Sequence, residues 1–400
     1  MHSVCLVNGV FPPQKQGGAE NYLLRTASFL ESAGYDVSIL TTKPYDGSGS
    51  FRIERESFQG HTVYRFYPLN ISHRTEGTGG NVLAKGVWHH LDAVNVHAYR
   101  TVKRFLKDLD PTVVHTNNLM GISASVGRAV QSTDARHVHT LHDYSLLCPK
   151  TSLMREWTLP GDEIGVCEER PTPCVMYSRL KEFTIGTPDH VVGPSQHVID
   201  VHQQKGVFDS VPTSRIQHGV DEIAEEIPAE TAEKSVLYAG KIQRSKGLET
   251  LFEAGKRLSD VTVHICGGGP MEETVTEVAS EAENIRYHGF VSEDRLRSLR
   301  QEVDAAIVPS VWMENSPLVI YESLATGLPV IGSDIGGIPE LVEHGERGYL
   351  FEPENDAELA ECIRTIVDSD TTRMRENALA WARERTMEQH ISALTQVYGF

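Results

Sequence analysis

The sequence has little positive charge, little cysteine and no long hydrophobic run. Its 37 lysine and arginine residues stand against 55 aspartate and glutamate residues, which gives a formal net charge of −18. This deficit argues against a general nucleic-acid-binding protein, because such proteins gather positive charge. No apolar stretch reaches the roughly 18 residues that a membrane-spanning helix needs. We therefore expect a globular protein without a nucleic-acid partner.

Cysteine is also too scarce for a disulfide framework. The six cysteines are spread over 400 residues, and the first residues lack the basic segment of a secretory signal. Both features favour a reducing, cytoplasmic environment. Cys148, Cys167 and Cys174 gather around one segment. Their spacings match no zinc knuckle, so free thiols are favoured over a metal site or a disulfide.

What the sequence has in abundance is short β-branched runs that alternate with longer amphipathic stretches. This alternation predicts an α/β fold with parallel sheets covered by helices on both faces. The predicted strands of the first half are 4–8, 36–42, 62–66, 112–116, 136–141, 190–194 and 215–217. Those of the second half are 235–239, 261–266, 285–288, 305–308, 329–332 and 348–351.

The two series of strands predict two Rossmann-like domains that face each other across a central cleft. We place the N-terminal domain at 1–220 and the C-terminal domain at 221–386, with a last helix at about 387–400 that packs back on the first domain. Ligands of open α/β sheets bind at the carboxyl ends of the strands. Segments 44–60 and 70–81 are predicted loops, and the insertion 149–174 is compatible with a lid or with plain surface elaboration.

One predicted helix, at about 317–326, has the features of an anion site. A Ser316 hydroxyl as the N-cap, followed by Pro317 at the first helical position, is typical of a helix start, and Gly327 with Pro329 is typical of a helix end. The helix begins where the predicted strand 305–308 has ended. Its free amides and the positive end of its dipole therefore point to the carboxyl edge of the sheet. The usable donors are the amides of Ser316, Leu318 and Val319, because Pro317 has no N–H.

Glu322 lies in the middle of this otherwise apolar helix, and Glu314 lies just before it. A buried carboxylate is costly unless something partners it. The two hydroxyl groups of a ribose, beside a phosphate held at the helix end, would be suitable partners. An ion pair with a nearby arginine or lysine is the alternative. A retaining glycosidase pair is disfavoured, because eight residues of helix would separate the carboxylates by about 12 Å.

Several glycine-rich and charged motifs occur in a fixed order along the chain. They are Gln16-Gly17-Gly18-Ala19-Glu20, Thr140-Leu141-His142-Asp143-Tyr144, Tyr238 to Gly247 (YAGKIQRSKG), Gly267 to Pro270, Gly289 to Val291, and Gly336 to Glu340. Together with Glu314 and Glu322, these motifs resemble those of the family 4 retaining glycosyltransferases of the GT-B fold, over nearly the whole chain. The basic motif departs from the family pattern in having Lys241 where arginine is usual, and Arg244 is a candidate to supply the missing guanidinium.

The resemblance implies transfer of a sugar from a UDP- or GDP-sugar to a hydroxyl group of a glycan, a glycolipid or a small molecule. The family retains the anomeric configuration, and we expect no metal ion or other cofactor. The implied catalytic residues are His142, Lys246 and Glu314. The implied donor-binding residues are Gly17, Gly18, Lys241, Arg244, Lys246, Val291, Glu314, Asn315, Ser316, Leu318, Val319 and Glu322. Glycolipid or surface-polysaccharide assembly is the pathway class that the resemblance implies, with the base, the sugar and the oligomeric state left open.

Other interpretations remain. A catalytically silent nucleotide-sugar-binding subunit would have the same fold, and a sugar phosphorylase or an epimerase could share it. An NAD-dependent oxidoreductase is disfavoured, because GGGPME lacks the third glycine of a dinucleotide fingerprint. Four cations form a stripe on one predicted helix: Arg100, Lys103, Arg104 and Lys107. The stripe is compatible with peripheral contact to an anionic membrane and with an ordinary solvated helix face.

Overall fold

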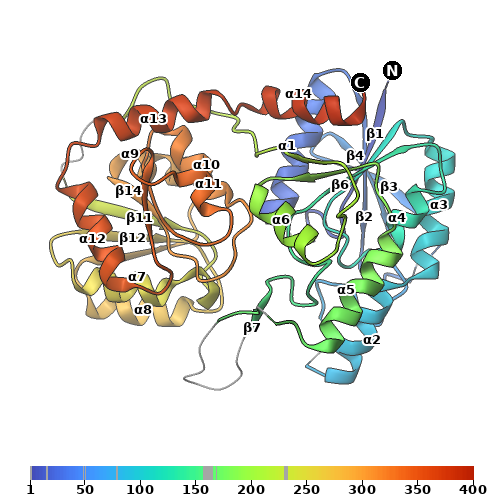
Figure 1. The fold of residues 1–400 in the computed structure, drawn as a ribbon, viewed down its shortest axis with the longest axis horizontal. Helices are drawn as coiled ribbons and strands as arrows, with labels where there is room; N and C mark the ends of the chain where they lie inside the picture. Colours follow the sequence, from blue (N-terminus) through green and yellow to red (C-terminus); the bar gives the residue numbers. More distant parts are fainter. Residues whose placement is uncertain are drawn as a thin grey trace. The chain divides into compact units, whose positions relative to one another are not determined.

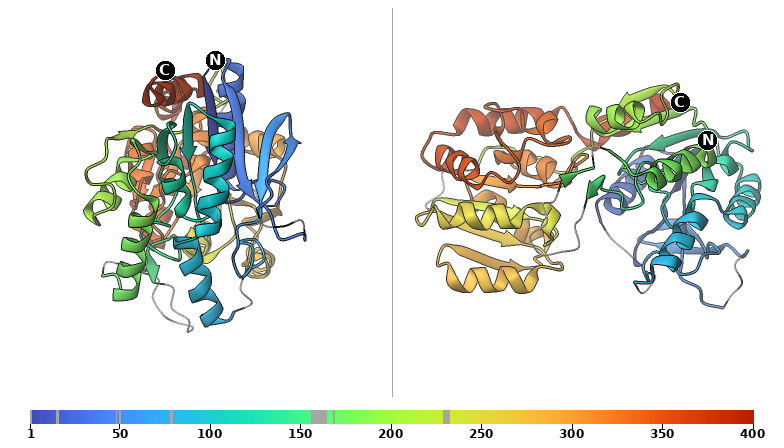
Figure 2. Two further views of the ribbon diagram at one scale, coloured as in Figure 1. Left: turned by 90° about the vertical axis from the view of Figure 1, so that its right-hand side faces the viewer. Right: turned by 60° about the horizontal axis from the view of Figure 1, so that its bottom comes forward.

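The computed structural model of the protein describes residues 2–14, 17–47, 49, 51–77, 80–155, 165–167, 169–228 and 233–400. The chain forms two compact units (Figures 1 and 2). Unit 1 comprises Met1–Leu153, Cys167–Gln217 and Met387–Phe400, and unit 2 comprises Met154–Val166 and His218–Thr386. Each unit contains a largely parallel sheet between helices, so the predicted fold class is confirmed.

The sheet of unit 1 has eight strands in the order β10-β9-β6-β5-β1-β2-β4-β3. All neighbouring strands are parallel except β3 and β4. The central strands are buried on both faces, as parallel strands under helices must be. The strands are β1 (Ser3–Val7), β2 (Asp36–Thr42), β3 (Glu54–Phe58), β4 (His61–Phe66), β5 (Val113–Thr116), β6 (Arg136–Thr140), β9 (His190–Gly193) and β10 (Thr213–Arg215).

Two helices distant in sequence, α1 (Gly18–Ser32) and α14 (Met387–Tyr398), pack together on one face of this sheet. Met387, Ile391 and Leu394 are buried and recur at the spacing of one helix face. Burial of each such side chain stabilises the unit by about 1.5–3 kcal/mol. The remaining helices are α2 (Val82–Ala93), α3 (Val96–Leu109), α4 (Ser125–Val130) and α5 (Thr172–Ile185), which lie on the opposite face (Figure 1), and α6 (Gln196–Gln204), beside β9 and β10.

The sheet of unit 2 has six parallel strands in the order β13-β12-β11-β14-β15-β16. They are β11 (Ser235–Ala239), β12 (Thr262–Cys266), β13 (Ile285–Gly289), β14 (Ala305–Val308), β15 (Val330–Ser333) and β16 (Gly348–Phe351). One hydrophobic core lies under α7 (Leu248–Lys256), α8 (Glu272–Glu281) and α12 (Asp356–Val367). The other lies under α9 (Glu293–Glu302), α10 (Leu318–Ala325), α11 (Ile338–Val342) and α13 (Thr372–Arg383).

The structure differs from the prediction mainly in segments expected to be loops. β3 lies within the predicted loop 44–60 and pairs antiparallel with β4. Its middle residues are exposed and polar, which hides the alternation that marks a half-buried strand. The insertion 149–174 contains β7 (Met154–Arg155), which pairs with β8 (Gly165–Val166), and the start of α5. Residues 156–164 of the insertion lie outside the described residues. None of the described helices is both long enough and apolar enough to cross a bilayer.

Candidate functional site

A basic turn lies directly on the carboxyl end of β14 in unit 2. The turn is the short helix η1 (Arg244–Lys246), followed by Gly247 at φ +71°. A Cβ on Gly247 would lie 1.7 Å from the carbonyl oxygen of Pro309, so only glycine allows this close approach. The Val311 amide also donates to the Ser245 carbonyl at 3.1 Å. These contacts fix Lys246 beside the loop between β14 and α10.

Lys246 and Glu314 meet at this place. The Lys246 Nζ donates to the Glu314 Oε1 at 2.5 Å, and the Ser310 Oγ donates to the same oxygen at 2.8 Å. The Lys246 Nζ also lies 5.1 Å from the ring centroid of Trp312. The Glu314 side chain is only 7% exposed and that of Lys246 is 24% exposed. An ammonium group has three donors, so Lys246 can hold Glu314 and still bind a second anion.

The loop after β15 also contacts Glu314, through the Glu314 backbone. The Gly337 amide donates to the Glu314 carbonyl at 2.8 Å. Gly336 has φ +64°, and a Cβ there would lie 2.2 Å from that carbonyl oxygen. Three segments distant in sequence therefore converge on Glu314: the basic turn, the β14–α10 loop and the loop that precedes α11.

The N-terminus of α10 lies at the end of the β14–α10 loop, next to the buried residues Asn315 and Ser316. The prediction that the Ser316 hydroxyl caps the helix is wrong. Pro317 occupies the cap position without a side-chain bond, and the Ser316 Oγ instead lies 2.7 Å from the Tyr321 hydroxyl. The first amides of α10, including those of Leu318 and Val319, have no intrahelical acceptor. The helix end keeps the chemistry of an anion site.

Glu322 is held by a buried arginine. The Arg300 Nη2 donates to the Glu322 Oε2 at 2.5 Å, and the Arg300 Nη1 donates to the exposed Glu293 at 3.3 Å. The Arg300 side chain is 3% exposed and that of Glu322 is 22% exposed. An arginine partner was the alternative left open for Glu322, but sequence reasoning did not name Arg300. Its position four residues after Leu296, on the apolar face of α9, is the signal that could have identified it.

The other two cations of the basic motif, Lys241 and Arg244, are not gathered at Glu314. Lys241 is exposed, and its carbonyl accepts a hydrogen bond from the Tyr238 hydroxyl at 2.8 Å. The Arg244 guanidinium pairs with the exposed Glu249 at 3.3 Å instead of facing Lys246. Val291 is half-buried and follows the turn at Gly289, which has φ +66°. In unit 2 the structure thus brings together Lys246, Glu314 and the N-terminus of α10.

In unit 1, polar side chains follow two neighbouring strands, β5 and β6, at their carboxyl ends. His142, after β6, donates from Nε2 to the Asn117 Oδ1 at 2.8 Å, and its ring packs edge-on against Tyr22 at 4.8 Å. The Asp143 carboxylate accepts from the Asn118 Nδ2 at 2.7 Å. The ring of His142 is partly exposed, but dense packing desolvates it and lowers its pKa to about 4. It is therefore a neutral imidazole at pH 7.

The glycine loop lies at the start of α1, next to β1. Gly17 is the extended N-cap residue, and Gly18 begins the helix. Glu20 is buried in the first turn and accepts from the Asn8 Nδ2 at 3.3 Å. The preceding residue of the motif, Gln16, lies outside the described residues.

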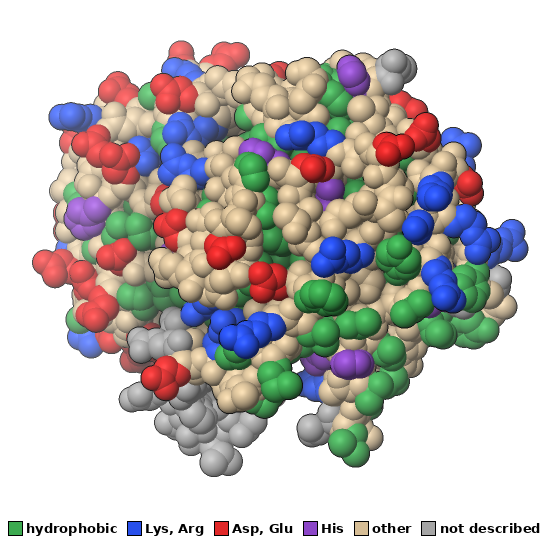
Figure 3. Space-filling model, turned by 45° about the vertical axis from the view of Figure 1, so that its right-hand side comes forward, with side chains coloured by type: hydrophobic (Ala, Val, Ile, Leu, Met, Phe, Trp, Pro, Cys, Tyr) green, Lys and Arg blue, Asp and Glu red, His purple; other side chains and the backbone are tan. Residues whose placement is uncertain are grey.

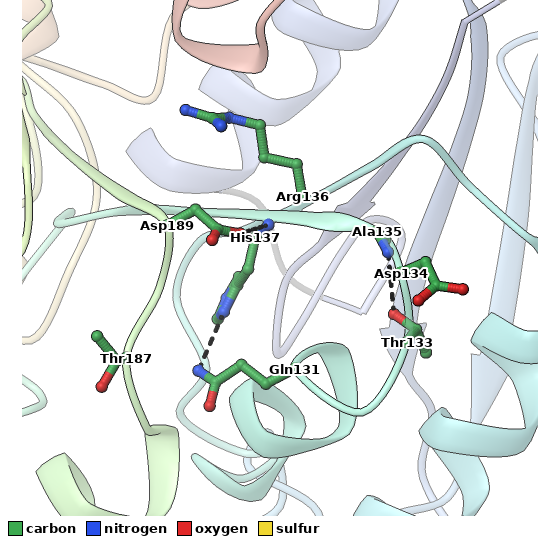
Figure 4. Close-up of a pocket in the computed structure, with 8 residues that line it drawn as sticks. All are labelled: Gln131, Thr133, Asp134, Ala135, Arg136, His137, Thr187 and Asp189. Atoms are coloured by element: carbon green, nitrogen blue, oxygen red, sulfur yellow. Dashed lines mark hydrogen bonds between the residues drawn. The ribbon is translucent and has the colours of Figure 1, made fainter.

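A separate open pocket of about 390 Å³ lies at the amino end of β6 (Figure 4). Its polar groups largely satisfy one another: the His137 amide donates to the Asp189 carboxylate at 2.7 Å, and the Arg136 Nε donates to the Val397 carbonyl at 2.8 Å. It lies at the edge of the sheet opposite His142, and we assign no function to it. The described residues include no group of three or more histidine, cysteine, aspartate or glutamate residues placed to hold a metal ion.

Comparisons with known proteins identify the family of the chain. The family model described as "Glycosyl transferase 4-like domain" matches residues 17–216, and "Glycosyl transferases group 1" matches residues 220–383. The chain is 32% identical over 405 residues to the D-inositol 3-phosphate glycosyltransferase of Corynebacterium efficiens, covering 96% of this chain and 90% of that protein.

Two solved structures share the fold. The sucrose-phosphate synthase of Thermosynechococcus elongatus has a TM-score of 0.74 at 18% identity and covers 100% of this chain and 98% of its own. The Alr3699/HepE protein of Anabaena, solved in complex with UDP, has a TM-score of 0.69 at 18% identity and covers 100% of both chains. The chain therefore belongs to the group 1, family 4-like glycosyltransferases of the GT-B fold.

Proposed function

We propose that this glycosyltransferase takes a sugar from a nucleotide diphosphate donor, a UDP- or GDP-sugar, and transfers it to a hydroxyl group with retention at the anomeric carbon. The observation that carries the donor assignment is the Lys246–Glu314 pair at the N-terminus of α10. A cation, a carboxylate and a helix end suit a phosphate that is attached to a sugar. The similarity to a protein solved with UDP supports the same class of donor.

Lys246 and the first amides of α10 would stabilise the negative charge that grows on the leaving diphosphate. Each well-placed donor in a dry site contributes about 3 kcal/mol to the transition state. Glu314 accepts from Lys246 and Ser310, which fixes its carboxylate, and it would orient hydroxyl groups of the donor sugar. We propose that no divalent metal takes part, because the ammonium group and the helix dipole already supply positive potential.

In the proposed step, the bond between the anomeric carbon and the phosphate oxygen breaks, and a bond to the acceptor oxygen forms on the same face of the sugar. The proton of the acceptor hydroxyl passes to the leaving phosphate oxygen. His142 would contact the reacting sugar or the acceptor hydroxyl as a neutral imidazole. Its Nε2–H is committed to Asn117, which fixes the tautomer in which Nδ1 is unprotonated.

Glu322 would bind the ribose hydroxyl groups, with Arg300 as its positioning residue. Arg300 holds one carboxylate oxygen, and a carboxylate can accept several hydrogen bonds. We expect Arg300→Leu to reduce the preference for UDP over 2′-deoxy-UDP, because the carboxylate is no longer held. Equal preference in the wild type and in Arg300→Leu would contradict this role. Glu293→Gln, which changes only the exposed partner of Arg300, is the control.

The proposed acceptor is a hydroxyl group of a glycan, of a lipid-linked glycan or of a small molecule. We place the reaction in the cytoplasm, with peripheral membrane contact when the acceptor is lipid-linked. A catalytically silent nucleotide-sugar-binding subunit is the alternative, and the convergence of Lys246, Glu314 and the α10 N-terminus favours the enzyme.

The test is calorimetric titration with UDP, GDP, ADP and NAD in the presence of a chelator, followed by assays of donor-sugar transfer. We expect one diphosphate to bind, and Lys246→Met to bind it about 100-fold more weakly. The control is Lys256→Met, which removes an exposed lysine of α7 in the same unit. Equal nucleotide affinity of Lys246→Met and Lys256→Met would show that Lys246 does not bind the diphosphate. Binding of NAD alone would overturn the proposal, and binding without transfer would favour the silent subunit.

A further inference from the structure

Exposed hydrophobic side chains are concentrated in one part of unit 1. Ten large hydrophobic residues stand out as exposed among the described residues, and nine of them lie between residues 45 and 183. They include Leu83 (81%) and Val87 (50%) on α2, and Met176 (66%) and Phe183 (73%) on α5. The tenth, Phe290, lies in unit 2. Scattered surface hydrophobics are ordinary, but a gathering of this kind marks a contact surface.

The elements that carry these residues are joined to one another. α2 and α5 pack side by side, with the rings of His89 and Tyr177 edge-on at 5.8 Å. The loop that contains Leu69 and Ile71 is held on α2, because the Trp88 Nε1 donates to the carbonyl of Ser72 at 2.9 Å. When the right-hand side of Figure 1 faces the viewer, α2, α3 and α5 lie in front of the sheet (Figure 2, left). We call the surface of these three helices and the 69–72 loop the helical face.

A buried ion pair joins α5 to α2, two of the three helices of the helical face. The Lys181 Nζ of α5 lies 2.8 Å from the Asp92 Oδ2 of α2, and the two side chains are 1% and 0% exposed. The other oxygen of Asp92 accepts from the Gly121 amide at 2.6 Å. The two helices are therefore held in one arrangement, and the apolar residues are presented without a rearrangement.

The charge of the helical face is opposite to that of the whole chain. Asp108 is the one fully exposed acidic residue among the described side chains of the three helices, since Asp92 is buried and Glu182 is half-buried. The exposed cations on these helices are Lys85, Arg100, Arg104, Lys107 and Arg179. Figure 3 shows hydrophobic, basic and histidine side chains together at the lower right, whereas acidic side chains lie mainly toward the top and the left. This contrast occurs in a chain whose net charge is −18.

We propose that the helical face docks on the surface of an anionic lipid bilayer. Leu83, Val87, Met176 and Phe183 enter the boundary between headgroups and acyl chains, and the surrounding cations contact the anionic headgroups. The combination of bulky apolar side chains with lysine and arginine is what such a boundary requires. Docking would set unit 1 against a lipid-linked acceptor, but the inference does not depend on the proposed transfer reaction.

The test is co-sedimentation of the full chain with vesicles of phosphatidylglycerol and phosphatidylcholine, without nucleotide, against vesicles of phosphatidylcholine alone. We expect binding to the anionic vesicles that weakens with salt. Arg100→Gln/Arg104→Gln/Lys107→Gln should lower the partition coefficient by about 100-fold, since each cation near an anionic surface contributes about a fivefold effect. Leu83→Gln/Phe183→Gln should lower it by about tenfold or more.

Phe290→Gln is the matched control, because it removes an 89% exposed hydrophobic side chain from unit 2. All substituted residues are exposed, and circular dichroism with thermal melting checks that the variants remain folded. Absence of binding to the anionic vesicles, or equal losses in Phe290→Gln and Leu83→Gln/Phe183→Gln, would refute the proposal. Sedimentation velocity covers one further outcome. If the wild type forms dimers that the helical-face variants abolish, while vesicle binding is unchanged, the face joins two copies of the chain and the membrane assignment is wrong.

Discussion

Mild acid should destabilise unit 1 more than unit 2, because unit 1 buries a larger set of neutral histidines. Burial lowers their pKa well below the usual value, to about 3 for His115 and to about 4 for His137, His202 and His390. The pKa of His139 is lowered for the same reason. All five are at most 4% exposed. Their hydrogen bonds fit neutral rings: His115, for example, lies between the Tyr398 hydroxyl at 2.7 Å and the Thr140 hydroxyl at 2.6 Å.

The size of the effect follows from proton linkage. In the unfolded chain a histidine has a pKa of about 6.5, so unfolding takes up protons at any pH between about 4 and 6.5. The stabilisation from the neutral rings is complete above the unfolded pKa and is lost as the pH falls toward the native pKa. From pH 7 to pH 6, each buried histidine costs about 0.7 kcal/mol, and five cost about 3 kcal/mol. The native rings are uncharged at both pH values, so this figure does not depend on how far below 5 each native pKa lies.

Hydrogen exchange measured at the two pH values, corrected for intrinsic rates, separates the units. We expect the opening free energy of amides in β5 and β6 to fall by about 3 kcal/mol between pH 7 and pH 6. Amides of β11 and β14 serve as the internal comparison. The lowered histidines of unit 2, His264 and His288, cost at most about 0.7 kcal/mol each by the same linkage, so the expected fall there is at most about 1.4 kcal/mol. His137→Gln should reduce the pH dependence of β5 and β6 by about 0.7 kcal/mol. A change below about 1 kcal/mol in the wild-type protein would refute the reasoning, since the rings would then be charged or solvated in the native state.

Three further predictions concern buried charge and close packing. Lys181→Met should lower the free energy of unfolding in urea denaturation by about 3–5 kcal/mol, because it leaves a buried carboxylate without a counter-charge. Adding Asp92→Asn should restore most of this loss, and equal stability of the single and double variants would contradict the reasoning. Gly336→Ala should weaken nucleotide binding at least tenfold, because the added Cβ would lie 2.2 Å from the Glu314 carbonyl oxygen. Gly345→Ala is the control: its φ is also positive, but no atom lies within 4 Å of the added Cβ, so it should bind normally in the same titration. Arg65→Lys should lower the free energy of unfolding by about 1–3 kcal/mol, because the 2% exposed guanidinium donates to two carbonyl groups of the loop before α1. An unchanged melting temperature would show that other contacts hold this loop.

Much of the fold could be predicted from the sequence. In a parallel sheet, the short apolar runs that favour strands locally are also the segments that helices bury on both faces. Runs such as Ser235–Ala239 and Ala305–Val308 are almost entirely apolar and are followed directly by glycine or proline, and the structure has strands with these bounds. β3 could not be predicted in this way. It is an edge strand whose exposed face is polar, and only its pairing with β4 makes it a strand.

The candidate site could be predicted in part. The spacing of the two glutamates around the start of α10 singled out Glu314, and the resemblance of the basic motif to the family pattern implied Lys246. The structure joins the two side chains. The partner of Glu322 could not be predicted, because Arg300 reaches it from another helix, 22 residues away along the chain. The Ser316 hydroxyl was given the wrong role for a similar reason. Its bond to Tyr321 depends on side-chain packing that a local capping pattern does not contain.

The position of α14 in the fold has a consequence for synthesis on the ribosome. α14 seals the core of unit 1, and its Tyr398 covers His115, yet residues 218–386 of unit 2 are translated between the rest of unit 1 and α14. At typical translation rates this interval lasts roughly 10–30 seconds. During that time unit 2 can fold while Leu23, Ile39 and their neighbours in unit 1 still lack their covering helix. The nascent chain can therefore contain a folded unit 2 while the hydrophobic core of unit 1 is still exposed where α14 will pack. Unit 1 is then the part of the chain most in need of a chaperone.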